Sequence, residues 1–201
     1  MVGKGDIVVF GSYPQNSEII SEKESIEWLV LDKKDDKILC VSKYLLDCRP
    51  YHERLEEITW EKSTLRKWLN EVFVLVAFTA EERMRILLSN VENPTQHTLD
   101  RIFLLSYDEA EEFLDLEHRA AKTTAYSRAQ GAWLLQEDGA NTELKENGTW
   151  WLRYYGEASG ESEGEFDFMS CVNYDGVVEP AAESVNVSSC CVRPAVWFTE
   201  Y

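Results

Sequence analysis

A cysteine and a histidine four positions apart are the first residues of this chain that could carry chemistry. Cys48 and His52 lie in the segment D-C-R-P-Y-H-E, and a thiol beside an imidazole is the arrangement of a nucleophilic dyad. Pro50 between them disfavours the helix that would align the two side chains, and we recognise no third residue that would orient the imidazole. We therefore favour a structural loop here. The other histidines, His97 and His118, lie in polar segments and are expected to face solvent.

The thiols are the next candidates. The chain has five cysteines, an odd number without a C-x-x-C pair: Cys40, Cys48, Cys171, Cys190 and Cys191. We recognise no export signal, so we expect reduced thiols. Cys171 and either Cys190 or Cys191 could meet across neighbouring strands. On a regular strand Cys190 and Cys191 point to opposite faces, so only one of them can meet Cys171. The alternative is that these cysteines are small buried hydrophobic residues.

Aromatic residues gather in the C-terminal third, beside a loop rich in Gly, Ser and Glu. On a pleated strand Trp150 faces one way and Trp151 the other, so we expect one tryptophan in the core and its neighbour at the surface. Exposed rings next to an adaptable loop are typical of a surface that recognises protein or sugar, and plain packing is the alternative. The predicted ligand-binding residues are Trp151, Arg153, Tyr154, Tyr155, Tyr174 and Asp175.

Two arginines lie in apolar, strand-like segments of the same third. Arg153 and Arg193 each need a partner if they are buried, and we expect an ion pair with Asp167 or Glu179. The alternative is that they bind an anionic group of a ligand. Residues 156–167 carry carboxylates at alternate positions, which could gather a hard cation such as calcium. They match no calcium-loop template, so we favour a solvated loop.

Short strands and helices must position these residues. Residues 7–10, 26–31 and 38–41 are β-like runs separated by turn residues, which predicts a strand followed by a hairpin. From residue 59 the apolar period changes to three and four, which predicts an amphipathic helix capped by Thr59 or Ser63. Its apolar face consists of Leu65, Trp68, Leu69, Val72, Phe73 and Val76.

The middle of the chain carries further helix signals. Capping-box spacing at Thr79 and at Ser106 predicts two short helices. Residues 101–105 are typical of a buried strand, and residues 123–130, closed by Gly131, predict another helical segment.

After about residue 147 the helical period disappears. Strands are predicted at residues 150–153, 166–172, 177–178 and 192–198. An Asp-Gly pair at positions 175 and 176 indicates a tight hairpin turn between the second and third of these strands. Strand-rich ends around a helical middle predict an α+β fold in which the first and last strands pair. We find no internal repeat and no linker, so residues 1–201 are expected to form a single domain.

Composition limits the function classes. The chain has 201 residues, of which 44% are hydrophobic, and this excludes intrinsic disorder. Lys and Arg number 20 against 37 Asp and Glu, for a net charge of −17, so we expect neither a nucleic-acid nor a membrane partner. The longest apolar run, residues 72–78, is far shorter than the roughly 20 residues of a spanning helix. The expected location is therefore the cytoplasm.

Several ordered segments resemble an uncharacterised bacterial family of unknown function that is common in gut Firmicutes. They are F-G-S-Y-P-Q (10–15), I-E-W-L-V-L (26–31), T-W-E-K-S-T-L-R-K-W-L-N (59–70), F-L-L-S (103–106), W-W-L-R (150–153) and V-R-P-A (192–195). The resemblance covers nearly the whole chain, and it implies no settled activity.

The C-terminal order of W-W-L-R, an Asp-Gly hairpin and V-R-P-A also resembles C-type-lectin-like folds. It is similar to those of the formylglycine-generating enzyme superfamily and of retroelement-diversified variable proteins. The resemblance to formylglycine-generating enzymes implies copper(I) held between two cysteine thiolates, here Cys171 and Cys190. The resemblance to the variable proteins implies a binding face on residues 154–189. Calcium-dependent lectins use Glu-Pro-Asn and Trp-Asn-Asp, whereas this chain has Glu-Pro-Ala at residues 179–181. Calcium-mediated sugar binding is therefore not expected.

The favoured hypothesis is a non-catalytic binding module without a cofactor. It would bind an unknown protein or carbohydrate ligand through its C-terminal loops, residues 154–189. One alternative is a copper oxidase of the formylglycine-generating type that uses Cys171 and Cys190. A second is calcium-independent carbohydrate binding, and a third is a mobile-element accessory protein that serves only for interaction.

Overall fold

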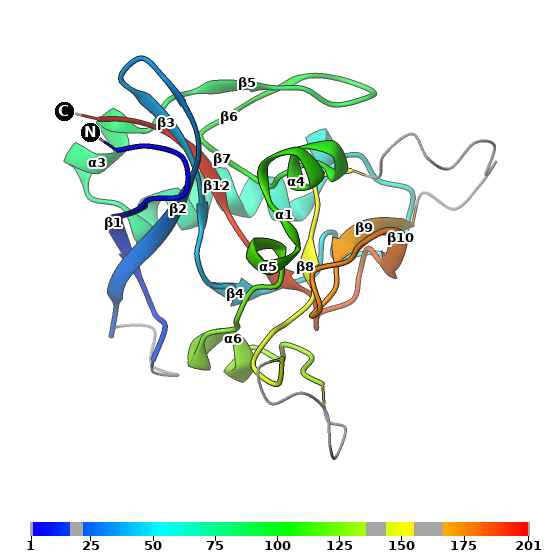
Figure 1. Cartoon of the computed structure of the whole chain (residues 1–201). Coiled ribbons are helices and arrows are strands. Elements are labelled where there is room, and N and C mark those ends of the chain that lie inside the picture. Colours follow the sequence, from blue (N-terminus) through cyan, green and yellow to red (C-terminus); the bar gives the residue numbers. More distant parts are fainter. Residues whose placement is uncertain (1, 17–21, 136–143, 155–166, 201) are drawn as a thin grey trace.

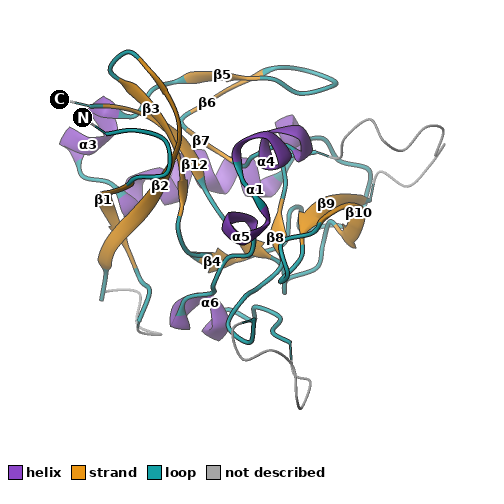
Figure 2. Ribbon diagram, in the orientation of Figure 1, coloured by secondary structure: helices purple, strands orange, loops and turns teal. Residues whose placement is uncertain are grey.

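The computed structural model of the chain describes residues 2–16, 22–135, 144–154 and 167–200 (Figure 1). It has a mixed α+β architecture, in which short helices lie around two five-stranded sheets and a small separate hairpin (Figure 2). The α+β class expected from the sequence is confirmed. Among the described residues, no helix combines the length and the apolar character that crossing a membrane requires.

The first sheet contains the predicted N-terminal strand and hairpin. Its order is β1 (Ile7–Tyr13), β2 (Glu24–Lys34), β3 (Lys37–Ser42), β12 (Ala195–Thr199) and β7 (Ile102–Phe103). All of its strand pairs are antiparallel. The expected pairing of the first and last strands is wrong in detail. The last strand, β12, pairs with β3 and β7, so it shares a sheet with β1 without pairing with it.

The second sheet is built mainly from the C-terminal third. Its order is β10 (Val178–Ser184), β9 (Phe168–Val172), β8 (Trp150–Trp151), β11 (Cys191–Val192) and β4 (Asp47–Cys48). The predicted tight turn joins β9 to β10, where the Gly176 N–H donates to the Asn173 carbonyl at 2.9 Å. Gly176 has a φ of +87°, a conformation that favours glycine.

The small hairpin and the helices complete the fold. The hairpin pairs β5 (Ser89–Val91) with β6 (Thr98–Asp100). The helical elements are η1 (Trp60–Lys62), α1 (Thr64–Trp68), η2 (Leu69–Phe73), α2 (Val74–Ala77), α3 (Ala80–Arg85), α4 (Tyr107–Phe113), α5 (Leu116–Arg119) and α6 (Ala125–Ala129). The capping boxes predicted at Thr79 and Ser106 are both formed.

The predicted amphipathic helix is interrupted by a π-helical turn. Ser63, and not Thr59, caps α1 by accepting the backbone N–H of Arg66. The π-helical element η2 then shifts the register, because it places more residues in one turn than an α-helix does. As a result Phe73 is buried while Val72, which was expected on the same face, is 46% exposed.

Candidate binding face

Both tryptophans of the W-W-L-R segment are buried, so the expectation that one of them reaches the surface is wrong. Trp150 donates its indole N–H to the Arg119 carbonyl at 3.0 Å. Trp151 donates to the Arg49 carbonyl at 2.8 Å and meets the edge of the Tyr51 ring. Since other elements cover both faces of β8, Trp151 cannot contact a ligand at the surface.

Arg153 is also buried, and its guanidinium is fully used inside the protein. It forms an ion pair with Glu109 at 2.9 Å, and not with Asp167 or Glu179 as predicted. Its remaining hydrogen bonds go to the side chain of Asn93 and to the carbonyls of Leu104 and Glu92. All five N–H groups therefore have protein acceptors, and none is left for an anionic ligand.

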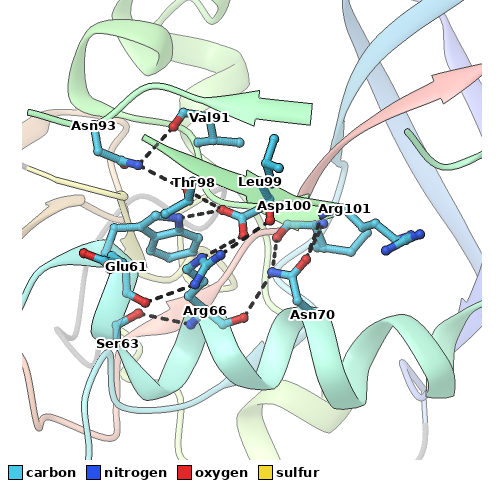
Figure 3. A network of polar contacts seen from close by, with 12 residues as sticks. Glu61, Ser63, Arg66, Asn70, Val91, Asn93, Thr98, Leu99, Asp100 and Arg101 are labelled. Atoms are coloured by element: carbon cyan, nitrogen blue, oxygen red, sulfur yellow. Dashed lines mark hydrogen bonds and ion pairs between the residues drawn. The ribbon is translucent and has the colours of Figure 1, made fainter. Parts of the chain in front are cut away.

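A buried polar network joins the hairpin β5–β6 to the first helical segment (Figure 3), and Arg153 bonds to it through the side chain of Asn93. Asn93 bonds to Thr98, and Thr98 donates to the buried carboxylate of Asp100 at 2.7 Å. The same carboxylate accepts the indole N–H of Trp60 and pairs with Arg66. The segments 59–70 and 150–153, which carry the family resemblance, are thus linked to each other by polar contacts with the hairpin β5–β6.

Arg193 follows β11 and is buried in a different way. Its Nε donates to the Ser42 carbonyl at 2.9 Å and its Nη1 to the His118 carbonyl at 2.8 Å, while the guanidinium lies 4.9 Å from the centroid of the Trp150 ring. Within the described part of the chain no carboxylate pairs with it, so the predicted ion pair with Asp167 or Glu179 is absent there. Burial lowers the pKa of this guanidinium.

Two of the predicted binding residues follow the W-W-L-R segment directly. Tyr154 is half-buried, with the Arg153 guanidinium 5.4 Å from its ring centroid. Tyr155 lies outside the described residues, as do residues 156–166 of the acidic stretch.

Tyr174 and Asp175 lie in the β9–β10 turn, where the structure does bring predicted binding residues together. The Asp175 carboxylate accepts the backbone N–H of Val177 at 3.2 Å. The Tyr174 ring packs against Trp133, with 5.7 Å between the ring centroids, and Trp133 is 46% exposed. Tyr174 and Asp175 are half-buried, and Val177 is exposed.

This turn is held against helix α5. A Cβ atom at Gly176 would come within 2.4 Å of the Leu116 carbonyl and 3.2 Å of its Cδ1, so only glycine fits. The side chain of Leu116 is exposed at the same place. We call the surface formed by Leu116, Trp133, Tyr174, Asp175 and Val177 the turn face.

Trp133 was not predicted as a binding residue. It follows α6 and the helix-ending Gly131, and its backbone N–H donates to the carbonyl of Ser189 at 3.0 Å. Its position beside Tyr174 depends on this contact between distant segments. The available signal was a lone tryptophan just after a helix stop, outside every predicted element.

The cysteines form two close pairs in the second sheet. The Sγ atoms of Cys171 and Cys190 lie 3.7 Å apart, as the first of the two predicted pairings requires. Cys191 points the other way and is the cross-strand neighbour of Cys48. Burial raises the pKa of the Cys171 and Cys190 thiols. Among the residues that the structure describes, no group of three or more His, Cys, Asp or Glu side chains could hold a metal ion.

The proposed cysteine–histidine dyad is not formed. The Cys48 thiol donates to the Ser188 carbonyl at 3.0 Å, whereas His52 contacts Glu56 through Nε2 at 2.9 Å. His52 accepts the backbone N–H of Thr64 through Nδ1. The structural interpretation of this loop therefore holds, and Glu56 is the residue that orients the imidazole.

Comparison with known proteins supports the family resemblance. A family model described as a domain of unknown function (DUF6273) matches residues 35–200. No curated protein matches the chain, and no solved structure matches it. The match extends over four of the six segments noted in the sequence and leaves out those at residues 10–15 and 26–31. The chain belongs to the family of domains of unknown function DUF6273.

Proposed function

We propose that this protein is a non-catalytic binding module that holds a partner protein on the turn face. The observation that carries the proposal is the exposed Trp133 ring, packed against Tyr174 beside the Asp175 carboxylate. Aromatic side chains supply large contact area at a low cost in conformational entropy, which is why they dominate protein interfaces. The resemblance to C-type-lectin-like folds, in which loops of the C-terminal half bind ligands, supports the same region.

The aliphatic neighbours favour protein over carbohydrate as the ligand. Leu116 is 53% exposed and Val177 is 44% exposed, on either side of the turn. A sugar site needs several polar groups around its aromatic platform, whereas apolar side chains next to aromatic rings are typical of the core of a protein interface. The turn face is also fixed by the close contact of Gly176 with α5, so binding would cost little ordering of the backbone.

The test uses the parent protein and two variants of the full chain as baits in a native lysate. Quantitative mass spectrometry measures the recovery of the partner by each bait. Trp133→Ser combined with Tyr174→Ser should reduce recovery of the partner about tenfold or more, the loss expected when interface anchors are removed. Met84→Ser is the matched control, because Met84 on α3 is 79% exposed and lies outside the turn face. Equal recovery by all three proteins would contradict the proposal. Loss of glycan-array binding in the double variant alone would support the carbohydrate alternative.

A second candidate function rests on the pair Cys171 and Cys190. Two sulfur atoms 3.7 Å apart fit the two-thiolate site that copper(I) prefers, as the resemblance to formylglycine-generating enzymes implies. Both thiols are buried with raised pKa values, which opposes the deprotonated form that binds metal. Stoichiometric copper(I) uptake that Cys171→Ser abolishes would favour this candidate. Unchanged metal content in that variant would remove it.

A further inference from the structure

A polar pocket of about 490 Å³ shares no lining residue with the turn face. Its lining comes mainly from residues 15–16 and 24–27 on one side and from residues 122–128, which lead into α6, on the other. Its volume is in the range of small-molecule sites. No contact described so far accounts for this pocket.

Most charges around the pocket are already paired with each other. Lys122 and Glu146 form an ion pair at 3.1 Å on one side. Glu27 pairs with Lys43 at 2.9 Å on another. These side chains neutralise each other, so they give the pocket polarity without a net preference for a charged ligand.

Arg128 and Glu24 also line the pocket and carry opposite charges. The Nη1 of the Arg128 guanidinium donates to the backbone and hydroxyl oxygens of Thr123 at 3.2 Å, and these are its hydrogen bonds among the described residues. The Glu24 carboxylate accepts the backbone N–H groups of Gln15 at 2.7 Å and Asn16 at 3.3 Å. In the described ranges, neither group has an ion-pair partner of opposite charge. The pocket therefore presents a fixed cation and a fixed anion.

Uncharged polar groups line the same pocket. The Gln15 amide is held by two hydrogen bonds from its Nε2, to the carbonyls of Glu24 and Ser25, so the position of its carbonyl oxygen is set. Tyr44 also lines the pocket, but Lys43 sits 5.1 Å from the centroid of its ring. That covered face of the ring cannot serve as a stacking platform for a sugar.

We propose that this pocket binds a short peptide with free termini. The terminal carboxylate pairs with Arg128, since guanidinium and carboxylate form charge-assisted hydrogen bonds. The terminal ammonium pairs with Glu24, and the peptide amides meet the uncharged polar lining. The site is independent of the turn face, so the failure of either proposal leaves the other untouched.

Isothermal titration calorimetry on the full chain tests the proposal. The probes are a panel of tripeptides that vary only the central residue, together with the N-acetylated and C-amidated forms of the tightest binder. Each blocked form should bind about tenfold or more weakly, because it loses one charge-assisted interaction. The disaccharide maltose serves as a neutral comparison and should not bind.

Three variants assign the two ends of the peptide. Arg128→Gln should abolish the discrimination between the free acid and the C-amide, while it keeps the discrimination against the N-acetyl form. Glu24→Gln should do the opposite. Arg101→Gln is the matched control and should bind like the parent, because Arg101 is exposed and does not line the pocket. No binding by any tripeptide, equal binding of free and blocked forms, or preferential binding of maltose would each overturn the proposal.

Discussion

The two five-stranded sheets bury different kinds of side chain. In the first sheet the Phe10 ring stacks between Trp28, at a centroid distance of 4.9 Å, and Phe198, at 3.9 Å. The second sheet buries four cysteines, and a buried guanidinium follows each of its strands β8 and β11. Loss of a group in the first sheet removes contact area, whereas loss of a group in the second leaves a polar partner without an interaction.

The largest expected effect is at Arg153. Replacing Arg153 with Met leaves the Glu109 carboxylate and the Asn93 side chain without their partner, so we expect a loss of about 3–5 kcal/mol in the free energy of unfolding. Urea denaturation measures it. Arg101→Met is the control, because that arginine is exposed, and it should change stability by no more than about 0.5 kcal/mol. A loss at Arg153 as small as the control would show that the network contributes little to stability.

The stacked rings of the first sheet should respond moderately. Phe198→Leu keeps an apolar side chain but removes the stacking contact with Phe10, so we expect a loss of about 1–2 kcal/mol. The same denaturation experiment applies. A loss equal to that of Arg153→Met would erase the difference between the two sheets.

Arg193 offers the sharpest test within the second sheet. Arg193→Met removes hydrogen bonds to three carbonyls but also removes a buried charge that no described carboxylate balances. These effects partly offset each other, so we expect a loss of only about 1 kcal/mol. A loss comparable to that of Arg153→Met would mean that carbonyl groups stabilise this guanidinium as well as a carboxylate does.

The smallest effect is a pH dependence in the first sheet. Burial raises the pKa of the Cys40 thiol from 9.0 to about 12, so above pH 9 the unfolded chain releases a proton that the folded chain keeps. Stability from this group is full below pH 9 and declines as pH rises toward 12. Between pH 8 and pH 10, the free energy of unfolding should therefore fall by about 1 kcal/mol less in Cys40→Ala than in the parent protein. Parallel stability curves for the two proteins would contradict this assignment.

The sequence predicts those features that depend on neighbouring residues. The capping boxes at Thr79 and Ser106 and the Asp-Gly turn each involve groups within four positions, and all three are present. Strand alternation predicted only that one of Cys190 and Cys191 could meet Cys171, and the structure shows that Cys190 does so.

Features that depend on distant segments were missed or misassigned. Glu109 is 44 positions from Arg153, so nothing local distinguishes it from Asp167 or Glu179 as the partner. Alternation along β8 separates Trp150 from Trp151 but does not reveal that α5 and the segment after β4 supply partners for both indoles. Trp133 joins Tyr174 only through the fold, so the candidate site was predicted in part.

The position of β12 has a consequence for biosynthesis. Ala195–Thr199 lies between β3 and β7, about 150 positions along the chain from β3. While a ribosome is still making the intervening residues, the Lys37–Ser42 strand has an open hydrogen-bonding edge with apolar side chains on it. Such edges pair with other chains, and contacts between distant segments form slowly. The first sheet closes only after residue 199 has emerged, so nascent chains depend on protection from aggregation until then.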